Sequence, residues 1–181
     1  MKLLAFAAST SSSSINKRLV THAAEVFQKE VAPEATVQVI DLNDYEMPIY
    51  SSDREAASGI PELAQHLFDK IGEADALLIS FAEHNGHYTA AWKNTFDWMS
   101  RLGMKVFQDT PMIAMAASPG GRGGATVLEA AVSSAGYFGA NIKGSLSVGP
   151  FGEKFDTVSG VLSDAELSAD LKQMLMGLKD A

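Results

Sequence analysis

The chain has 181 residues, the usual size of one domain, and 46% of them are hydrophobic, as in ordinary globular proteins. Its formal net charge is −8 at pH 7, and its 14 Lys and Arg are spread along the sequence without a cluster. Because a nucleic-acid surface needs a basic patch, we expect no nucleic-acid partner. The chain contains no Cys, which excludes disulfides, thiolate nucleophiles and cysteine metal sites.

The first nine residues combine one Lys, an apolar stretch and small residues, in the manner of a signal peptide. The apolar stretch, residues 3–8, is shorter than the usual minimum of about seven residues. No apolar run approaches the roughly 18 residues of a membrane-spanning helix. We therefore expect a first strand here, and a soluble cytoplasmic protein with no membrane partner.

Strand-like and helix-like patterns alternate along the chain. The expected strands are residues 2–8, 36–42, 74–81, 111–117 and 141–148. The expected helices are 16–31, one beginning at Pro61, 89–100, one from Gly123 or Gly124 to about 138, and a last helix capped by Ser163 with Glu166 in a capping box. Residues 43–60 are expected to form a long polar loop. This alternation predicts one α/β domain over residues 1–181, a flavodoxin-like three-layer α/β/α sandwich with a five-stranded parallel sheet of order 2-1-3-4-5.

Three polar or glycine-rich segments directly follow buried strands. They are residues 9–16, 83–86 and 118–124. Parallel strands deliver their following loops to the same carboxyl edge of the sheet, which is where ligands bind in open α/β folds. The three segments together therefore predict one binding site.

The serine segment, residues 9–14, has the composition of a flexible linker. Its position between a buried strand and an amphipathic helix argues against that interpretation, because a mobile tether would separate elements that must pack. Hydroxyls and free amides at a helix N-terminus favour a phosphate. The segment contains no Gly or Lys, so it is neither a P-loop nor a dinucleotide fingerprint.

The second segment contains Asn85-Gly86, which is typical of a turn. In a site, Asn85 and the backbone amides would hydrogen-bond the edge of a flat heterocycle, and His84 would lie against it. His84 and His87 have no obvious third ligand, so we expect no metal site. The third segment is either a mobile loop or a surface that lets backbone approach a ligand, and Arg122 faces either solvent or an anionic cosubstrate.

The helix expected at 89–100 carries Trp92, Phe96 and Met99 on one face, which we assign to the core. Trp98 lies on a different face. With Leu102, it is expected to be exposed and to form a subunit contact.

Together these segments resemble the motifs of the NADPH-dependent FMN reductase family, which includes quinone, azo-dye and chromate reductases. The first family motif is Gly-Ser-x-Arg-x-x-Ser-x-Asn, and the second begins Pro-Glu-Tyr-Asn and continues to Leu-Lys-Asn-x-x-Asp. The third is Ser-x-Gly-x-x-Gly-Gly. The matching residues are Ser9, Ser14 and Asn16; Glu83, Asn85, Lys93, Asn94 and Asp97; and Ser118, Gly120, Gly123 and Gly124. Two departures from the family pattern matter for the site, since Ser11 replaces its Arg and His84 replaces its Tyr.

The resemblance implies FMN as cofactor, with NADPH or NADH as cosubstrate. It places the FMN phosphate at Ser9, Ser14 and Asn16, with Ser11 in the same loop. The isoalloxazine ring would be bordered by two sets of residues, Glu83, His84, Asn85 and Gly86 on one side and Ser118, Gly120 and Gly121 on the other. It also implies a homodimer or homotetramer.

On this basis the chain is expected to be an FMN-dependent NAD(P)H oxidoreductase that passes electrons to a quinone, free flavin or similar small molecule by a ping-pong cycle, with no catalytic side chain. Two alternatives stay open, an FMN-binding electron carrier and a flavodoxin-like binding protein with weakened flavin affinity. A signalling receiver domain needs carboxylates after the first strand, and residues 7–12 contain none.

Overall fold

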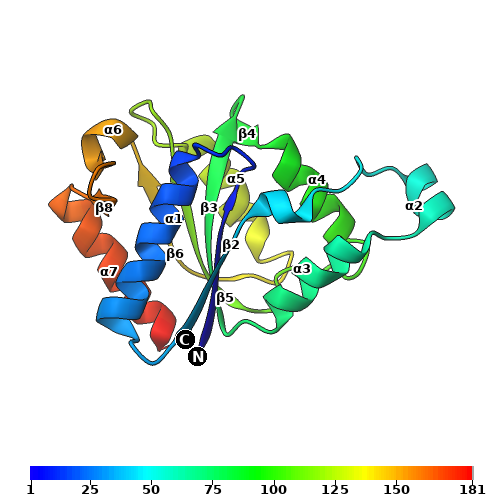
Figure 1. The fold of residues 1–181 in the computed structure, drawn as a ribbon, viewed down its shortest axis with the longest axis horizontal. Helices are drawn as coiled ribbons and strands as arrows, with labels where there is room; N and C mark the ends of the chain where they lie inside the picture. The colour runs from blue at the N-terminus through cyan, green and yellow to red at the C-terminus, as the bar shows by residue number, and fades with distance from the viewer. Residues whose placement is uncertain (181) are drawn as a thin grey trace.

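A five-stranded parallel sheet forms the centre of the molecule in the computed structural model, which describes residues 1–180. Its strands are β1 (Lys2–Ala8), β2 (Thr36–Ile40), β3 (Ala76–His84), β5 (Pro111–Ala117) and β6 (Asn141–Val148). They lie in the order β2-β1-β3-β5-β6, and the short β4 (His87–Tyr88) pairs antiparallel with the end of β3 (Figure 1). Counted among the parallel strands alone, this is the predicted order 2-1-3-4-5, so the flavodoxin-like architecture is confirmed.

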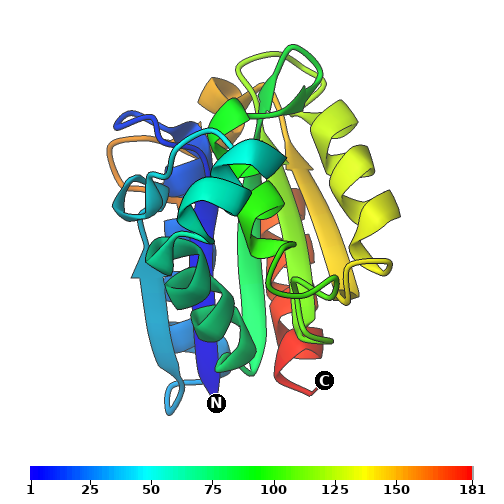
Figure 2. The ribbon, with the colours of Figure 1, turned by 90° about the vertical axis from the view of Figure 1, so that its right-hand side faces the viewer.

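Helices cover both faces of the sheet. One face carries α1 (Ile15–Val26), its π-helical continuation (Phe27–Val31) and α7 (Ala165–Lys179). The other face carries α3 (Glu62–Gly72), α4 (Ala90–Met99) and α5 (Ala125–Ala135), as Figure 2 shows from the side. The central strands β1, β3 and β5 are buried almost throughout because both of their faces are covered, which explains their unbroken apolar sequences.

Two local expectations are wrong. The region 43–60 is not one loop, because it contains a 3₁₀ helix at Leu42–Tyr45 and α2 (Ser52–Ser58), which projects from the body in Figure 1. The last helix is capped by Asp164 rather than Ser163, since the Asp164 carboxylate accepts a hydrogen bond from the amide of Leu167 at 3.0 Å. Both residue types are good caps, and the backbone path selects the one next to the helix.

The face of α4 that contains Trp98 is covered, contrary to expectation. Trp98 is only 1% exposed, and its indole N–H donates to the carbonyl oxygen of Pro48 at 2.7 Å. Its ring meets the edge of Tyr50 at 5.0 Å between centroids. The segment before α2 thus occupies the face that was expected to meet another subunit. Of the stripe assigned to the core, Trp92 and Met99 are buried as predicted, whereas Phe96 is half-buried and packs against the core.

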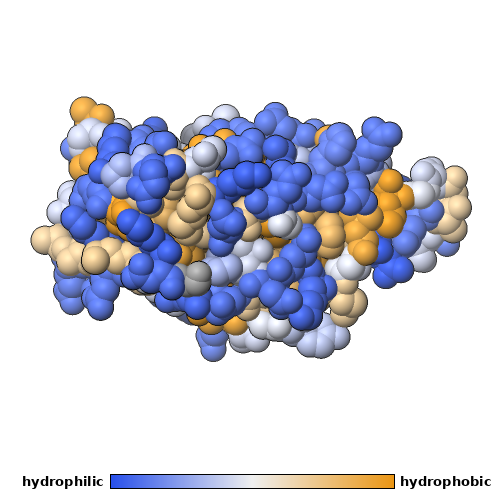
Figure 3. All heavy atoms as spheres, turned by 90° about the horizontal axis from the view of Figure 1, so that it is seen from below, coloured by the Kyte–Doolittle hydropathy of each residue, from blue (hydrophilic) through white to orange (hydrophobic). Residues whose placement is uncertain are grey.

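The C-terminal part adds α6 (Phe151–Lys154) and a hairpin of β7 (Phe155–Asp156) and β8 (Val161–Leu162) that packs beside α1. Seen from the end that carries both termini, the surface is mostly hydrophilic, with apolar residues in separate patches (Figure 3). Among residues 1–180, no helix is long and apolar enough to cross a membrane.

Candidate functional site

The three predicted segments do converge. The β1–α1 loop, the β3–β4 hairpin and the β5–α5 loop all lie at the carboxyl edge of the sheet, at the top of Figure 1 and opposite the two termini. Strands β1, β3 and β5 are direct neighbours in the sheet, so their loops are adjacent as well. This is the position at which open α/β sheets bind ligands.

The serine loop ends in a helix cap. The hydroxyl of Ser14 accepts a hydrogen bond from the amide of Lys17 at 3.2 Å, and Ser9 Oγ accepts one from the amide of Ser11 at 3.2 Å. Within residues 1–180, the amides of Ile15 and Asn16 have no acceptor. The loop therefore presents hydroxyls together with free backbone N–H groups at the positive end of a helix, which is a suitable arrangement for an anion.

The side chain of Asn16 points into the protein instead of into the loop. It is 2% exposed, and its Nδ2 donates to the carbonyl oxygen of Ala117 at 3.1 Å. Its Oδ1 accepts from Ser80 Oγ and from the Ala117 amide, both at 2.8 Å. The Asn16 side chain thus links α1 to β3 and β5, and its backbone amide, which has no acceptor among residues 1–180, is the group left for the predicted phosphate.

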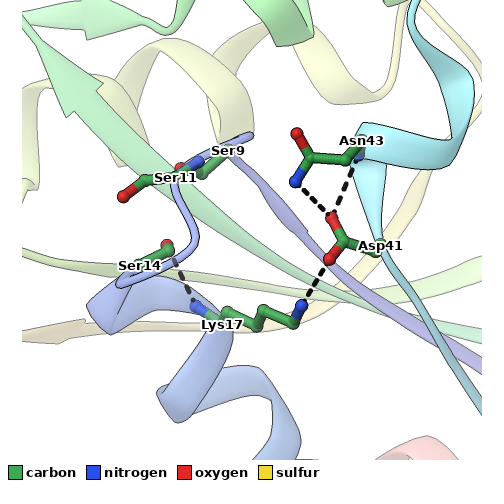
Figure 4. Close-up of polar contacts among 6 residues, drawn as sticks. All are labelled: Ser9, Ser11, Ser14, Lys17, Asp41 and Asn43. Carbon is green, nitrogen blue, oxygen red and sulfur yellow. Dashed lines mark hydrogen bonds and ion pairs between the residues drawn. The ribbon is translucent and has the colours of Figure 1, made fainter.

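Lys17 and Asp41 form a half-buried ion pair beside the serine loop, which the sequence analysis did not identify. Asp41 follows the last residue of β2, and its second carboxylate oxygen accepts hydrogen bonds from the amide and the side chain of Asn43 at 3.0 and 2.8 Å. Figure 4 shows the Lys17 side chain extending from the start of α1 to this carboxylate. The bonds from Lys17 and Asn43 hold the pKa of Asp41 below its usual value, so its carboxylate is ionised.

The second segment is a tight hairpin. Its central residues Asn85 and Gly86 have φ values of 53° and 77°, as a type I′ turn requires, and His84 pairs directly with His87. His84, Asn85 and His87 are exposed at its tip. Among residues 1–180, no group of three or more His, Asp or Glu side chains is arranged to hold a metal ion.

Glu83 lies in the first strand of this hairpin, opposite Tyr88, and its carboxylate bonds to a backbone amide of another element. Its Oε2 accepts a hydrogen bond from the amide of Val127 at 3.0 Å. Val127 lies in the first turn of α5, where a carboxylate satisfies a free amide and the helix dipole together. Glu83 therefore links the β3–β4 hairpin to the start of α5. This bond fixes the position of the second segment relative to the third.

The glycine-rich loop has two different halves. A Cβ atom added at Gly120 or Gly121 would meet nothing within 4 Å, so this half is open. Gly123 has a φ of 60°, and a Cβ there would lie 2.4 Å from Ser147 Oγ and 2.9 Å from the amide nitrogen of Gly149. The first half is thus free to approach a ligand, whereas the second half is required for packing.

The two polar side chains of the loop, Ser118 and Arg122, bond to neighbouring residues. Ser118 Oγ donates to the carbonyl oxygen of Gly120 at 3.1 Å. Arg122 is exposed, and its guanidinium donates to Thr126 Oγ1 at 2.6 Å. Neither contact blocks the open half of the loop.

A cavity of about 310 Å³ lies next to the serine loop, between the 42–49 segment and the start of α4. Asn94 supports one wall, because its Nδ2 donates to the carbonyl oxygens of Met47 and Pro48 at 3.0 and 3.2 Å. Its Oδ1 accepts from the amide of Tyr50 at 2.8 Å. The motif residue Asn94 therefore fixes the segment that borders the site.

Comparison with known proteins identifies the family to which this chain belongs. Residues 1–151 match the sequence profile of the NADPH-dependent FMN reductase family. An uncharacterised protein of Mycoplasma pneumoniae is 32% identical over 135 residues, which cover 72% of this chain and 81% of that protein. A quinone reductase of Escherichia coli is 31% identical over 80 residues, which cover 44% of this chain and only 43% of the enzyme.

A solved structure shows the same fold over almost the whole chain. It is a flavoenzyme of Paracoccus denitrificans described as an NAD(P)H:(acceptor) oxidoreductase, with a TM-score of 0.78 and 21% identity. The superposition covers 99% of this chain and 95% of that one. Since the family profile spans the β1–α1 loop, the β3–β4 hairpin and the β5–α5 loop, the chain belongs to the NADPH-dependent FMN reductase family.

Proposed function

We propose that this chain binds FMN at the carboxyl edge of its sheet and passes electrons from NADH or NADPH to a small acceptor such as a quinone or free flavin. The observation that carries the proposal is the convergence of three loops on neighbouring strands, one with hydroxyls and free amides and two with exposed backbone. When bound, FMN supplies the capacity to accept hydride and to give up electrons, while the protein supplies binding and orientation.

The serine loop fits the phosphate of FMN. Ser9, Ser11 and Ser14 bring hydroxyls to one short loop, and the free amides of Ile15 and Asn16 lie in the following turn. The oxygens of a phosphate would together accept hydrogen bonds from these hydroxyls and amides. The positive end of α1 would stabilise the negative charge of the phosphate.

The other two loops fit the ring. His84, Asn85 and Gly86 are presented at the tip of a hairpin after β3, and Gly120 and Gly121 follow the neighbouring strand β5. Open space at both glycines allows their backbone to lie against a flat heterocycle. Glu83 and Ser118 support these loops through hydrogen bonds to the backbone of Val127 and Gly120.

The proposed reaction requires no acid or base from the protein, so the residues of the site act by binding, orienting and exposing one face of the ring. The exposed face would accept the nicotinamide and the acceptor in turn, which gives ping-pong kinetics. The similarity to the Escherichia coli quinone reductase supports a quinone as acceptor. A homodimer or homotetramer is part of the same proposal.

Binding is tested by titrating the apoprotein with FMN and following flavin fluorescence. Ser14→Asp preserves the helix cap but places a negative charge against the phosphate, so FMN should bind more weakly. Ser14→Asn is the matched control, because it caps the helix without a charge. Equal FMN affinity in both variants would contradict the assignment of the phosphate to this loop.

Turnover is tested with NAD(P)H and a quinone. Initial-rate plots at several quinone concentrations should be parallel lines, whereas intersecting lines would show that both substrates bind together. Anaerobic NADH or NADPH should bleach the bound flavin. A yellow protein whose flavin neither donor bleaches would instead support the electron-carrier alternative.

A further inference from the structure

The first turn of α1 carries positive charge, which is unfavourable at the N-terminus of a helix. Lys17 and Arg18 occupy this turn, and it contains no acidic residue. The N-terminus of a helix has a partial positive charge, so cations in the first turn are unfavourable unless an anion is close by. The two side chains then diverge, since Arg18 donates to the carbonyl oxygen of Thr157 in the β7–β8 hairpin, while Lys17 pairs with Asp41.

Sheet order explains how Asp41 reaches the serine loop. Strands β1 and β2 are neighbours, and their last registered pair is Phe6 with Ile40. Asp41 therefore leaves the sheet beside the residues that lead from β1 into the serine loop. In Figure 4, the Lys17 side chain runs from the start of α1, where its backbone amide bonds to Ser14, to the Asp41 carboxylate, where its ammonium lies.

This position of Asp41 is a problem for a phosphate. An ionised carboxylate at the same edge of the sheet repels a bound anion, and two hydrogen bonds from Asn43 stabilise its charged form. Lys17 offsets that charge. Its side chain is 41% exposed and its stem is flexible, so the ammonium is free to reorient between neighbouring anions.

From this arrangement we infer that Lys17, whose ammonium is shared with Asp41, supplies the positive charge toward the phosphate of the flavin. Ser11 stands in the same loop with a neutral hydroxyl, whose bond is to Ser13 Oγ at 3.3 Å. Asp41 competes with the phosphate for the Lys17 ammonium and, as an anion, also repels the phosphate. The inference rests on the proposed binding of FMN and names Lys17 as the cation beside the phosphate loop.

The test compares FMN with riboflavin, which has the same ring but lacks the phosphate. Kd values are measured for the wild-type protein, Lys17→Met, Arg18→Met and Asp41→Asn by flavin fluorescence, with circular dichroism to confirm folding. Arg18→Met is the matched control, because it removes the same charge one residue further along the helix.

Lys17→Met should weaken FMN binding by about tenfold, the scale of one charge-assisted hydrogen bond, and should leave riboflavin binding unchanged. Asp41→Asn should tighten FMN binding, because the ammonium is no longer shared with a carboxylate. Arg18→Met should change FMN affinity less than Lys17→Met. Added salt should weaken FMN binding less in Lys17→Met than in the wild type.

Four results would overturn the inference. They are unchanged FMN affinity in Lys17→Met, an equal loss of FMN affinity in Arg18→Met, an equal loss of riboflavin affinity in Lys17→Met, and weaker FMN binding by Asp41→Asn. If the wild-type protein binds neither flavin, the proposed function itself fails, and this outcome is distinct from a wild-type protein that binds FMN without dependence on Lys17. Lys17→Gln, which keeps a polar side chain, repeats the test should the Met variant fold poorly.

Discussion

Replacing Asn16 by Ala separates a structural role from a ligand contact. The Asn16 side chain makes three hydrogen bonds inside the protein, to Ser80 Oγ and to both backbone groups of Ala117. Asn16→Ala removes all of them and leaves two buried donors, the Ser80 hydroxyl and the Ala117 amide, without this acceptor. An orphaned buried polar group costs about 1–3 kcal/mol, so we expect the free energy of unfolding to fall by about 2–6 kcal/mol.

The assay is urea denaturation of the apoprotein, followed by circular dichroism. A loss of this size is a large fraction of the total stability of a typical domain, about 5–15 kcal/mol, and shifts the midpoint clearly. Asn43→Ala is the matched control, because Asn43 is exposed and its loss should change the free energy of unfolding by well under about 1 kcal/mol. If Asn16→Ala retained wild-type stability in the apoprotein and lost only FMN binding, the structural assignment would be refuted.

The two halves of the glycine-rich loop should respond differently to a methyl group. Gly123→Ala should destabilise the fold by at least about 1–2 kcal/mol, because φ is positive and the new Cβ overlaps Ser147 Oγ, whereas Gly121→Ala should leave stability unchanged; equal midpoints in thermal denaturation would contradict this. Burial lowers the pKa of His22, against the opposing effects of Glu25 and Glu30, and its Nε2 accepts a hydrogen bond from the amide of Leu162. Since the unfolded chain then binds the proton more tightly, the contribution of His22 to stability is present above about pH 6.5 and is lost as the pH falls below that value. His22→Gln should therefore flatten the dependence of the urea midpoint on pH between about 7 and 5, and an unchanged slope would exclude His22 as its source.

Much of the fold could be predicted from local sequence because the central strands are buried on both faces. The apolar segments 2–8 and 111–117 coincide with β1 and β5, and the predicted strand 141–148 coincides with β6 at the edge of the sheet. The alternation of strands and helices leads to the observed order. The convergence of the three loops follows from the same rule, since parallel neighbours deliver their loops to one edge.

The prediction for Trp98 failed because helical periodicity assigns residues to the faces of a helix but does not indicate what covers each face. Trp98 was expected to be exposed, but the segment around Pro48, 50 residues earlier, packs over it and accepts its N–H. The resemblance places Asn16 at the phosphate, and only the folded sheet shows that its side chain bonds to Ser80 and Ala117, so that its backbone amide is the group left for a ligand. No local pattern contains such partners.

The amino-acid sequence by itself determined the fold class and the three loops that form the candidate site. The spacing of apolar residues, the residue types of turns and the positions of glycines are all properties of short segments. The tertiary structure alone decided which residues of those loops are free. In the folded protein, Glu83 bonds to the start of α5, Gly123 packs against β6, and Lys17 pairs with Asp41, which directly follows β2. These pairings join residues 24 or more positions apart. They depend on the order and register of the strands, which place distant charges and amides within hydrogen-bonding distance.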